Sequence, residues 1–108
     1  MKDLPKDLME NISDSEVEVL SWSAESQELK LLIEKEVGSE NGIITFSGVG
    51  LVHMPPRISL ESITIATLES EYPKEVSLQE DENIYLLNES WGEEYYIVAE
   101  SIEYDKNL

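Results

Sequence analysis

Residues 29–46 have the sequence LKLLIEKEVGSENGIITF, in which two segments of alternating or apolar residues flank a turn-forming segment. The Asn41-Gly42 pair tolerates the positive φ angles that a tight hairpin loop requires. We therefore predict an antiparallel β-hairpin that turns at Asn41-Gly42. Residues 29–36 are also compatible with a helix on propensity alone, but the turn signal favours the hairpin.

The first twelve residues predict a short amphipathic helix. Leu4, Leu8 and Ile12 are spaced four residues apart, which is typical of one apolar helix face. Pro5 suits a first helical turn, and Asn11 suits a stop.

A strand is predicted after this helix, because Val17 and Val19 alternate with glutamates. Leu20 and Trp22 continue in the opposite phase, as in a strand with one exposed face or a strand that contains a bulge. We expect Trp22, together with Phe46 of the hairpin, to lie in the core.

The rest of the chain predicts further short strands. Residues 43–54 form the returning strand, with a bulge or bend at Gly48 and Gly50, and Pro55-Pro56 ends it. The later assignments are a strand at residues 62–68 (or a helix), a short strand at Val76 and Leu78, a charged turn at residues 80–83, a strand at residues 84–87, a loop at residues 88–94 and a strand at residues 95–104. This pattern predicts a mainly β protein, an antiparallel β-sandwich or flattened barrel with one short N-terminal helix, in a single domain of residues 1–108.

The formal net charge is −17 on 108 residues, from 24 Asp and Glu against 7 Lys and Arg. Such an excess repels nucleic acid and anionic membranes and favours a basic protein partner. The chain has no cysteine, so its stability must come from packing without disulfides. Because no apolar run has the length of a signal sequence or a membrane span, we expect a cytoplasmic protein.

His53 is the only histidine in the chain. It lies at the end of an apolar strand, where a general base or metal ligand is one interpretation and a partly covered strand-end side chain is the favoured one. The sequence carries no nucleophile elbow, calcium-loop spacing or phosphate-binding glycine loop. We therefore expect no catalytic residue, no metal site and no cofactor.

Two acidic segments are candidates for partner recognition. In residues 88–96, large aromatic side chains lie among carboxylates, and such side chains can anchor an interface while the acids pair with Arg or Lys. A hairpin loop whose tryptophan folds back over the core is an equally good interpretation. In residues 69–82 the acids would steer a cationic partner, although a solubility face is the more common role of such a run. The predicted partner-binding residues are Trp91, Tyr95, Glu89, Glu93 and Glu94 in the first segment and Glu80, Asp81 and Glu82 in the second.

Several elements together resemble small bacterial β-rich domains of the immunity-protein type. They are Asp14-Ser15-Glu16-Val17, the strand with Trp22, residues 29–34, Phe46-Ser47-Gly48-Val49 and the terminal strand of residues 96–102. The resemblance implies a protein that neutralises a toxin, frequently a basic nuclease, by covering its active site. Charge favours the same kind of partner, since an acidic surface steers a cationic one at rates up to ~10⁸–10⁹ M⁻¹s⁻¹. The alternatives are a structural adaptor domain and a small-molecule-binding β-barrel, which needs a sizeable apolar cavity.

Overall fold

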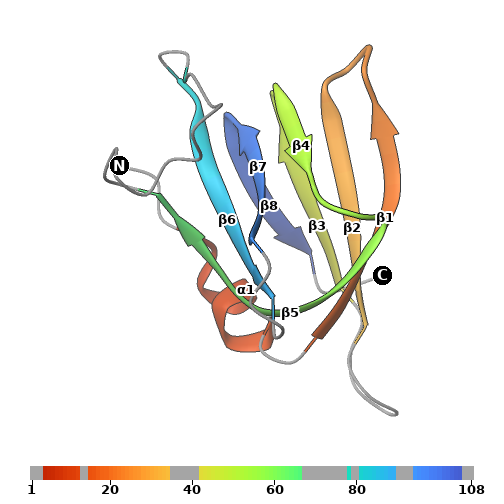
Figure 1. The fold of residues 1–108 in the computed structure, drawn as a ribbon, viewed down its shortest axis with the longest axis vertical. Coiled ribbons are helices and arrows are strands. Elements are labelled where there is room, and N and C mark those ends of the chain that lie inside the picture. Colours follow the sequence, from red (N-terminus) through yellow and green to blue (C-terminus); the bar gives the residue numbers. More distant parts are fainter. Residues whose placement is uncertain are drawn as a thin grey trace.

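One eight-stranded antiparallel sheet dominates the computed structural model, which describes residues 4–12, 15–34, 42–66, 78, 81–89 and 94–105 (Figure 1). The elements are α1 (Lys6–Asn11), β1 (Ser15–Ser23), β2 (Glu28–Glu34), β3 (Gly42–Ser47), β4 (Leu51–His53), β5 (Arg57–Ile65), β6 (Asn83–Glu89), β7 (Glu94–Ala99) and β8 (Ser101–Asp105). The strand order is β4-β7-β6-β5-β1-β2-β3-β8. The prediction of a mainly β, antiparallel protein with a short N-terminal helix is confirmed.

Two sharp bends carry the chain from one part of the sheet to another. β3 continues into β4 through Gly48, whose φ is 64°, and β7 continues into β8 through Glu100. β3 pairs with β8, and β4 pairs with β7. Hydrogen bonds from Gly50 N to Val98 O (2.9 Å) and from Glu100 N to Ser47 O (3.0 Å) connect the two ladders across the bends. The bend predicted from the glycines is therefore confirmed.

The predicted hairpin is formed by β2 and β3, so the helical alternative is wrong over residues 29–34. Its turn does not lie at Asn41-Gly42, because Gly42 is already in β3 and pairs with Ile33. An added Cβ on Gly42 would stand 2.6 Å from Cε1 of Tyr104 on the neighbouring strand. The glycine thus permits close approach to a tyrosine ring, and residues 35–41 lie outside the described part of the chain.

The core lies between α1 and the inner face of the sheet. Leu8 of α1 and Ile12, the residue that follows the helix, are buried there, and Leu4 packs against the same core, as the four-residue spacing predicts. Phe46 and Tyr85 are both fully buried and meet edge to face, with ring centroids 5.2 Å apart. No helix in the described residues is long and apolar enough to cross a membrane.

Other sequence assignments need correction. Trp22 is not in the core, because 48% of it is exposed. The strand predicted at residues 62–68 begins earlier, at Arg57, and ends at Ile65. Leu78 is not in a strand, and Val76 lies outside the described residues. Residues 95–104 form two strands instead of one, because the chain bends at Glu100 to pair first with β6 and then with β3.

Candidate functional site

Three of the predicted partner-binding residues lie at the two ends of β6. Asp81 and Glu82 precede the strand, whereas Glu89 is its last residue. Asp81 is exposed in a turn, and the other two are partly buried. A strand of seven residues spans roughly 20 Å at about 3.3 Å per residue. The acidic segment and the aromatic loop therefore meet β6 at opposite ends.

The other described residues of the aromatic loop begin β7. Glu94 pairs with Asn88 and Tyr95 with Leu87, close to Glu89. Tyr95 is partly buried and packs against the core. Glu80, Trp91 and Glu93 lie outside the described residues.

His53 is the last residue of β4, so its position at a strand end is as the sequence predicts. It is exposed there and not partly covered as expected. Its ring stacks on Tyr96, with centroids 4.8 Å apart, and lies 6.2 Å from the ring of Tyr95. Within the described residues, no three His, Asp or Glu side chains gather in a way that could hold a metal ion. The surroundings of His53 are thus two tyrosine rings.

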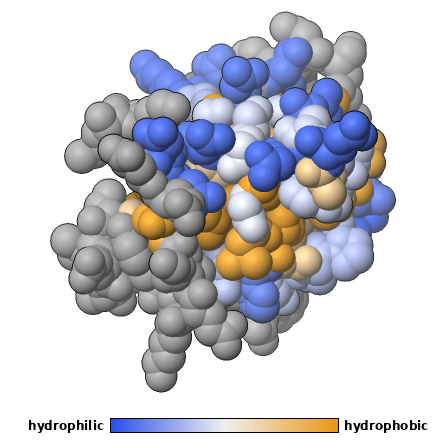
Figure 2. Space-filling model, turned by 90° about the horizontal axis from the view of Figure 1, so that it is seen from above, coloured by the Kyte–Doolittle hydropathy of each residue, from blue (hydrophilic) through white to orange (hydrophobic). Residues whose placement is uncertain are grey.

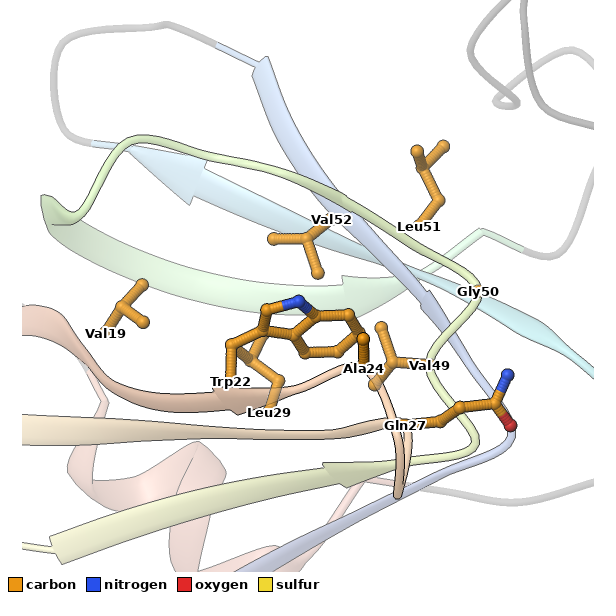
Figure 3. A pocket seen from close by; sticks show the side chains of 9 residues that line it. All are labelled: Val19, Trp22, Ala24, Gln27, Leu29, Val49, Gly50, Leu51 and Val52. Carbon is orange, nitrogen blue, oxygen red and sulfur yellow. The ribbon is translucent and has the colours of Figure 1, made fainter.

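An open apolar groove of about 490 Å³ lies between β1 and β4, and we call it the Trp22 groove (Figure 3). Leu29 and Val49 are buried at its base. The indole of Trp22 extends from β1 across the groove, and Val52 points toward it from β4. The lining residues are Val19, Trp22, Ala24, Gln27, Leu29, Val49, Gly50, Leu51 and Val52.

Large apolar side chains are exposed around this groove. Trp22 is 48% and Leu51 40% exposed, and Leu20, which does not line the groove, is 51% exposed. The face that lies uppermost in Figure 1 carries an apolar patch bordered by hydrophilic side chains (Figure 2). An exposed apolar patch with a polar rim is typical of an interaction site.

A β-bulge in β1, together with the end of the β1–β5 pairing at Glu18, explains the position of Trp22. The β1–β2 register shifts between Val19 and Ser21, so that Trp22 pairs with the buried Leu29. Residues directly opposite each other in a ladder share one face of the sheet, so Trp22 does point to the inner face. However, β5 pairs with β1 only as far as Glu18. The second half of β1 therefore faces an opening instead of packed side chains.

The base of the groove is held by a backbone contact between two loops. Val49 N donates a 2.9 Å hydrogen bond to the carbonyl oxygen of Gln27. Gln27 is in the left-handed region, with φ 55°, at the end of the β1–β2 turn. In the same turn, Ser26 N donates to Ser23 Oγ at 3.2 Å. These contacts fix the turn against the bend between β3 and β4.

Two strand edges border the groove. Val19 N donates to Pro56 O at 2.8 Å. Beyond the bulge at Leu20, residues 21–23 pair with β2 alone among the described segments. β4 ends the sheet and has β7 as its neighbour. Unpaired edges of this kind offer N–H and C=O groups to a further strand.

Carboxylates lie around the bend that lines the groove. The Glu82 side chain lies against Gly50, where an added Cβ would be 2.6 Å from Oε2. The Glu100 side chain lies against Gly48 in the same way. Glu25 is exposed in the β1–β2 turn. The charge beside the groove is therefore negative at both the turn and the bend.

The positive charges of the described residues are few, and two of them are paired with glutamates. Lys30 Nζ lies 3.9 Å from Glu28. Arg57 Nε donates to Glu16 Oε2 at 2.6 Å, and its other nitrogens lie 3.9 Å from Glu18 and 3.8 Å from Glu34. The hydrogen bond and the charge of Arg57 hold the pKa of Glu16 below its usual value.

Comparison of the chain with models of known protein families, with curated proteins and with solved structures gives no match.

Sequence reasoning did not find the Trp22 groove. The change of phase at Leu20 is the one local signal that pointed to it, because it indicates either an exposed face or a bulge. Neither that signal nor the composition indicates at which residue the pairing of β5 with β1 ends. Among the residues that were chosen from the sequence and that the structure describes, Glu82 has its side chain against the lining residue Gly50.

Proposed function

We propose that this chain is a non-catalytic protein-binding domain that holds a basic partner protein at the Trp22 groove. The observation that carries the proposal is a half-exposed tryptophan over an apolar groove in a chain with a net charge of −17. Tryptophan is enriched among the few residues that dominate the energy of protein interfaces. The indole supplies the anchor, and the charge selects the kind of partner.

The acids beside the groove favour a cationic surface. Glu25, Glu82 and Glu100 lie at the turn and the bend, where Lys or Arg of a partner can pair with them. Such charges raise the association rate more than the final affinity, and salt screens them. Rapid, salt-sensitive association is therefore expected.

A finer version of the proposal is an immunity protein that occludes the active site of a basic toxin. Its support is the pattern resemblance of the sequence together with the acidic charge. In this version Glu89, Glu94 and Tyr95 add contacts from the far end of β6. Trp91, Glu93 and Glu80 lie outside the described residues and are included on the sequence pattern alone. Inhibition would be stoichiometric, with one chain bound to one toxin.

The volume of the groove supports a second candidate, a small-molecule-binding protein. About 490 Å³ falls within the range of roughly 300–1,000 Å³ that ligand pockets occupy. Gln27 and the indole N–H of Trp22 are polar groups that could orient such a ligand. Uncharged aromatic fragments that bind at the groove by NMR, with the basic protein unable to displace them, would favour this candidate.

The experiment is a titration of the purified chain against the protein encoded by the neighbouring gene. A 1:1 complex is expected, weakened by about tenfold or more between 0.05 and 0.5 M NaCl. Reversing Glu80, Asp81 and Glu82 to Lys should slow association.

Trp22→Ala should weaken the complex, and Leu20→Ala is the matched control, because Leu20 is equally exposed on the same strand and does not line the groove. Absence of a complex, or a complex that responds to neither salt nor Trp22→Ala, would overturn the proposal. If the partner is a toxin, its activity should fall to zero at one equivalent of the chain.

A further inference from the structure

We infer that the Trp22 groove binds an extended, Lys- or Arg-bearing segment of the partner, which adds as a β-strand along the outer edge of residues 20–23 of β1. This inference rests on the proposed function and specifies its mode of binding.

The backbone provides the first argument. Up to Glu18, β1 has β5 on its outer side, and Val19 N still bonds to Pro56 O. Pro55 and Pro56 then separate β4 from β5, and neither proline can donate to a ladder. After the bulge at Leu20, residues 21–23 of β1 therefore keep one partner, β2, among the described strands. An extended peptide could complete this edge with main-chain hydrogen bonds.

The side chains beside this edge provide the second argument. In an added strand, every second side chain would point to the inner face of the sheet, where Leu29 and Val49 form the base of the groove. The Trp22 indole lies next to that base (Figure 3). Apolar side chains at alternate positions of the segment would therefore be covered by the Trp22 indole. The remaining side chains of the segment would point to the outer face of the sheet.

Charge identifies the occupant. The edge ends at the turn that contains Glu25, and the Glu82 side chain lies against Gly50, which lines the groove. Lys or Arg on the outward face of the segment would be attracted to these carboxylates. A second copy of this chain is a poor occupant, because each copy carries a charge of −17 and like charges disfavour pairing.

The experiment uses the full chain with Trp91→Phe, which leaves Trp22 as the only tryptophan. The probe is the acetylated and amidated peptide KVKLKVK, which alternates basic and apolar residues. Its controls are EVELEVE and a KVKLKVK peptide N-methylated at alternate residues, which loses the N–H groups of one edge. Binding is followed by Trp22 fluorescence, and the docking edge is located by amide hydrogen exchange.

KVKLKVK is expected to bind, to shift the Trp22 emission and to slow amide exchange within residues 20–23. EVELEVE should bind at least about tenfold more weakly because of charge, and the N-methylated peptide at least about tenfold more weakly because it loses several backbone hydrogen bonds. Thr64→Ala is the control, because Thr64 is exposed on β5 and does not line the groove. It should retain the affinity for KVKLKVK, whereas Trp22→Ala should lose most of it.

Equal binding of the methylated and unmethylated peptides would overturn strand addition. The proposed function would survive that result if the basic partner still required Trp22 and low salt. Binding of KVKLKVK without any change in exchange at residues 20–23, or dimerisation of the chain alone through this edge in sedimentation, would also overturn the inference. If the affinity for the basic partner protein depended neither on salt nor on Trp22, the proposed function itself would be wrong.

Discussion

The N–H of Val49 donates a 2.9 Å hydrogen bond to the carbonyl oxygen of Gln27. The bond joins the β1–β2 turn to the bend between β3 and β4, and both residues line the Trp22 groove. Gln27 accepts it from a left-handed backbone conformation. The shape of the groove therefore depends on a strained turn residue and on a backbone contact that side-chain substitution does not remove directly.

Replacement of Gln27 should test this strain. Gly has no penalty at φ 55°, so Gln27→Gly should leave the free energy of unfolding unchanged or raise it by up to about 1 kcal/mol. Gln27→Val places a β-branched residue there and should lower it by about 1–3 kcal/mol. Urea unfolding of the two variants measures the difference, and a Val variant as stable as the Gly variant would show that the turn carries no strain.

Phe46 and Trp22 should respond differently to truncation. Phe46 is fully buried against Tyr85, so Phe46→Ala should lower the free energy of unfolding by about 3–5 kcal/mol. Trp22 is half exposed, so Trp22→Ala should lower the free energy of unfolding much less, by about 1 kcal/mol. Thermal unfolding of both variants is the measurement. A Trp22→Ala variant as destabilised as Phe46→Ala would mean that the indole belongs to the core.

Tyr85 should be replaceable by Phe. Its hydroxyl is buried and has no hydrogen-bond partner in the described residues. Burial raises the pKa of Tyr85, and the Asn83 side chain partly offsets that rise without making a hydrogen bond of normal geometry to the hydroxyl. Removing a buried, unpaired hydroxyl should be neutral or stabilising by up to about 1 kcal/mol. A clear loss of stability in Tyr85→Phe at pH 7 would reveal a partner for the hydroxyl.

The same variant should change stability at high pH. Burial raises the pKa of Tyr85 above its usual value of 10.0, so the folded state keeps its proton at a pH where the unfolded state releases it. Stability from this group is therefore complete below pH 10 and is lost as pH rises from there through the raised pKa. Tyr85→Phe should flatten the alkaline decline in urea unfolding relative to the unchanged chain.

The Arg57 cluster should control the titration of Glu16. The hydrogen bond and charge of Arg57 lower the pKa of Glu16 below 4.5, so this pair stabilises the fold above that value and the contribution is lost as pH falls through the lowered pKa. Arg57→Met should return the pKa of Glu16 toward 4.5, as measured by NMR titration. Lys6→Met removes the same charge without contacting Glu16, and an equal shift in that control would point to net charge as the cause.

Much of the fold could be predicted because burial follows local alternation. Leu29, Leu31 and Ile33 are buried in β2, with polar or partly exposed residues between them. The spacing of Leu8 and Ile12 likewise predicted the buried face of α1. Both patterns are read within one element and need no knowledge of its neighbours.

The groove could not be predicted, because it depends on the residues at which pairing between strands far apart in the sequence ends. The sequence pattern assigns Trp22 to a strand but does not show that β5 leaves β1 at Glu18. Nor does it show that β4 pairs with β7 instead of extending the β2–β3 hairpin. A tryptophan on the inner face then stays half exposed, and the aromatic anchor chosen from composition, Trp91, lies outside the described residues.

Stopped-flow kinetics of the chain with the basic peptide KVKLKVK test the role of Trp22 most directly. Trp22→Ala should raise the dissociation rate by about tenfold or more, the effect of losing roughly 1.4 kcal/mol at a central anchor. Its association rate at a given salt concentration should stay close to that of the unchanged chain, because the charge is the same. Thr64→Ala, at an exposed position on β5 outside the groove, should alter neither rate. Equal dissociation rates for Trp22→Ala and the unchanged chain would contradict the assignment of the Trp22 groove as the binding site.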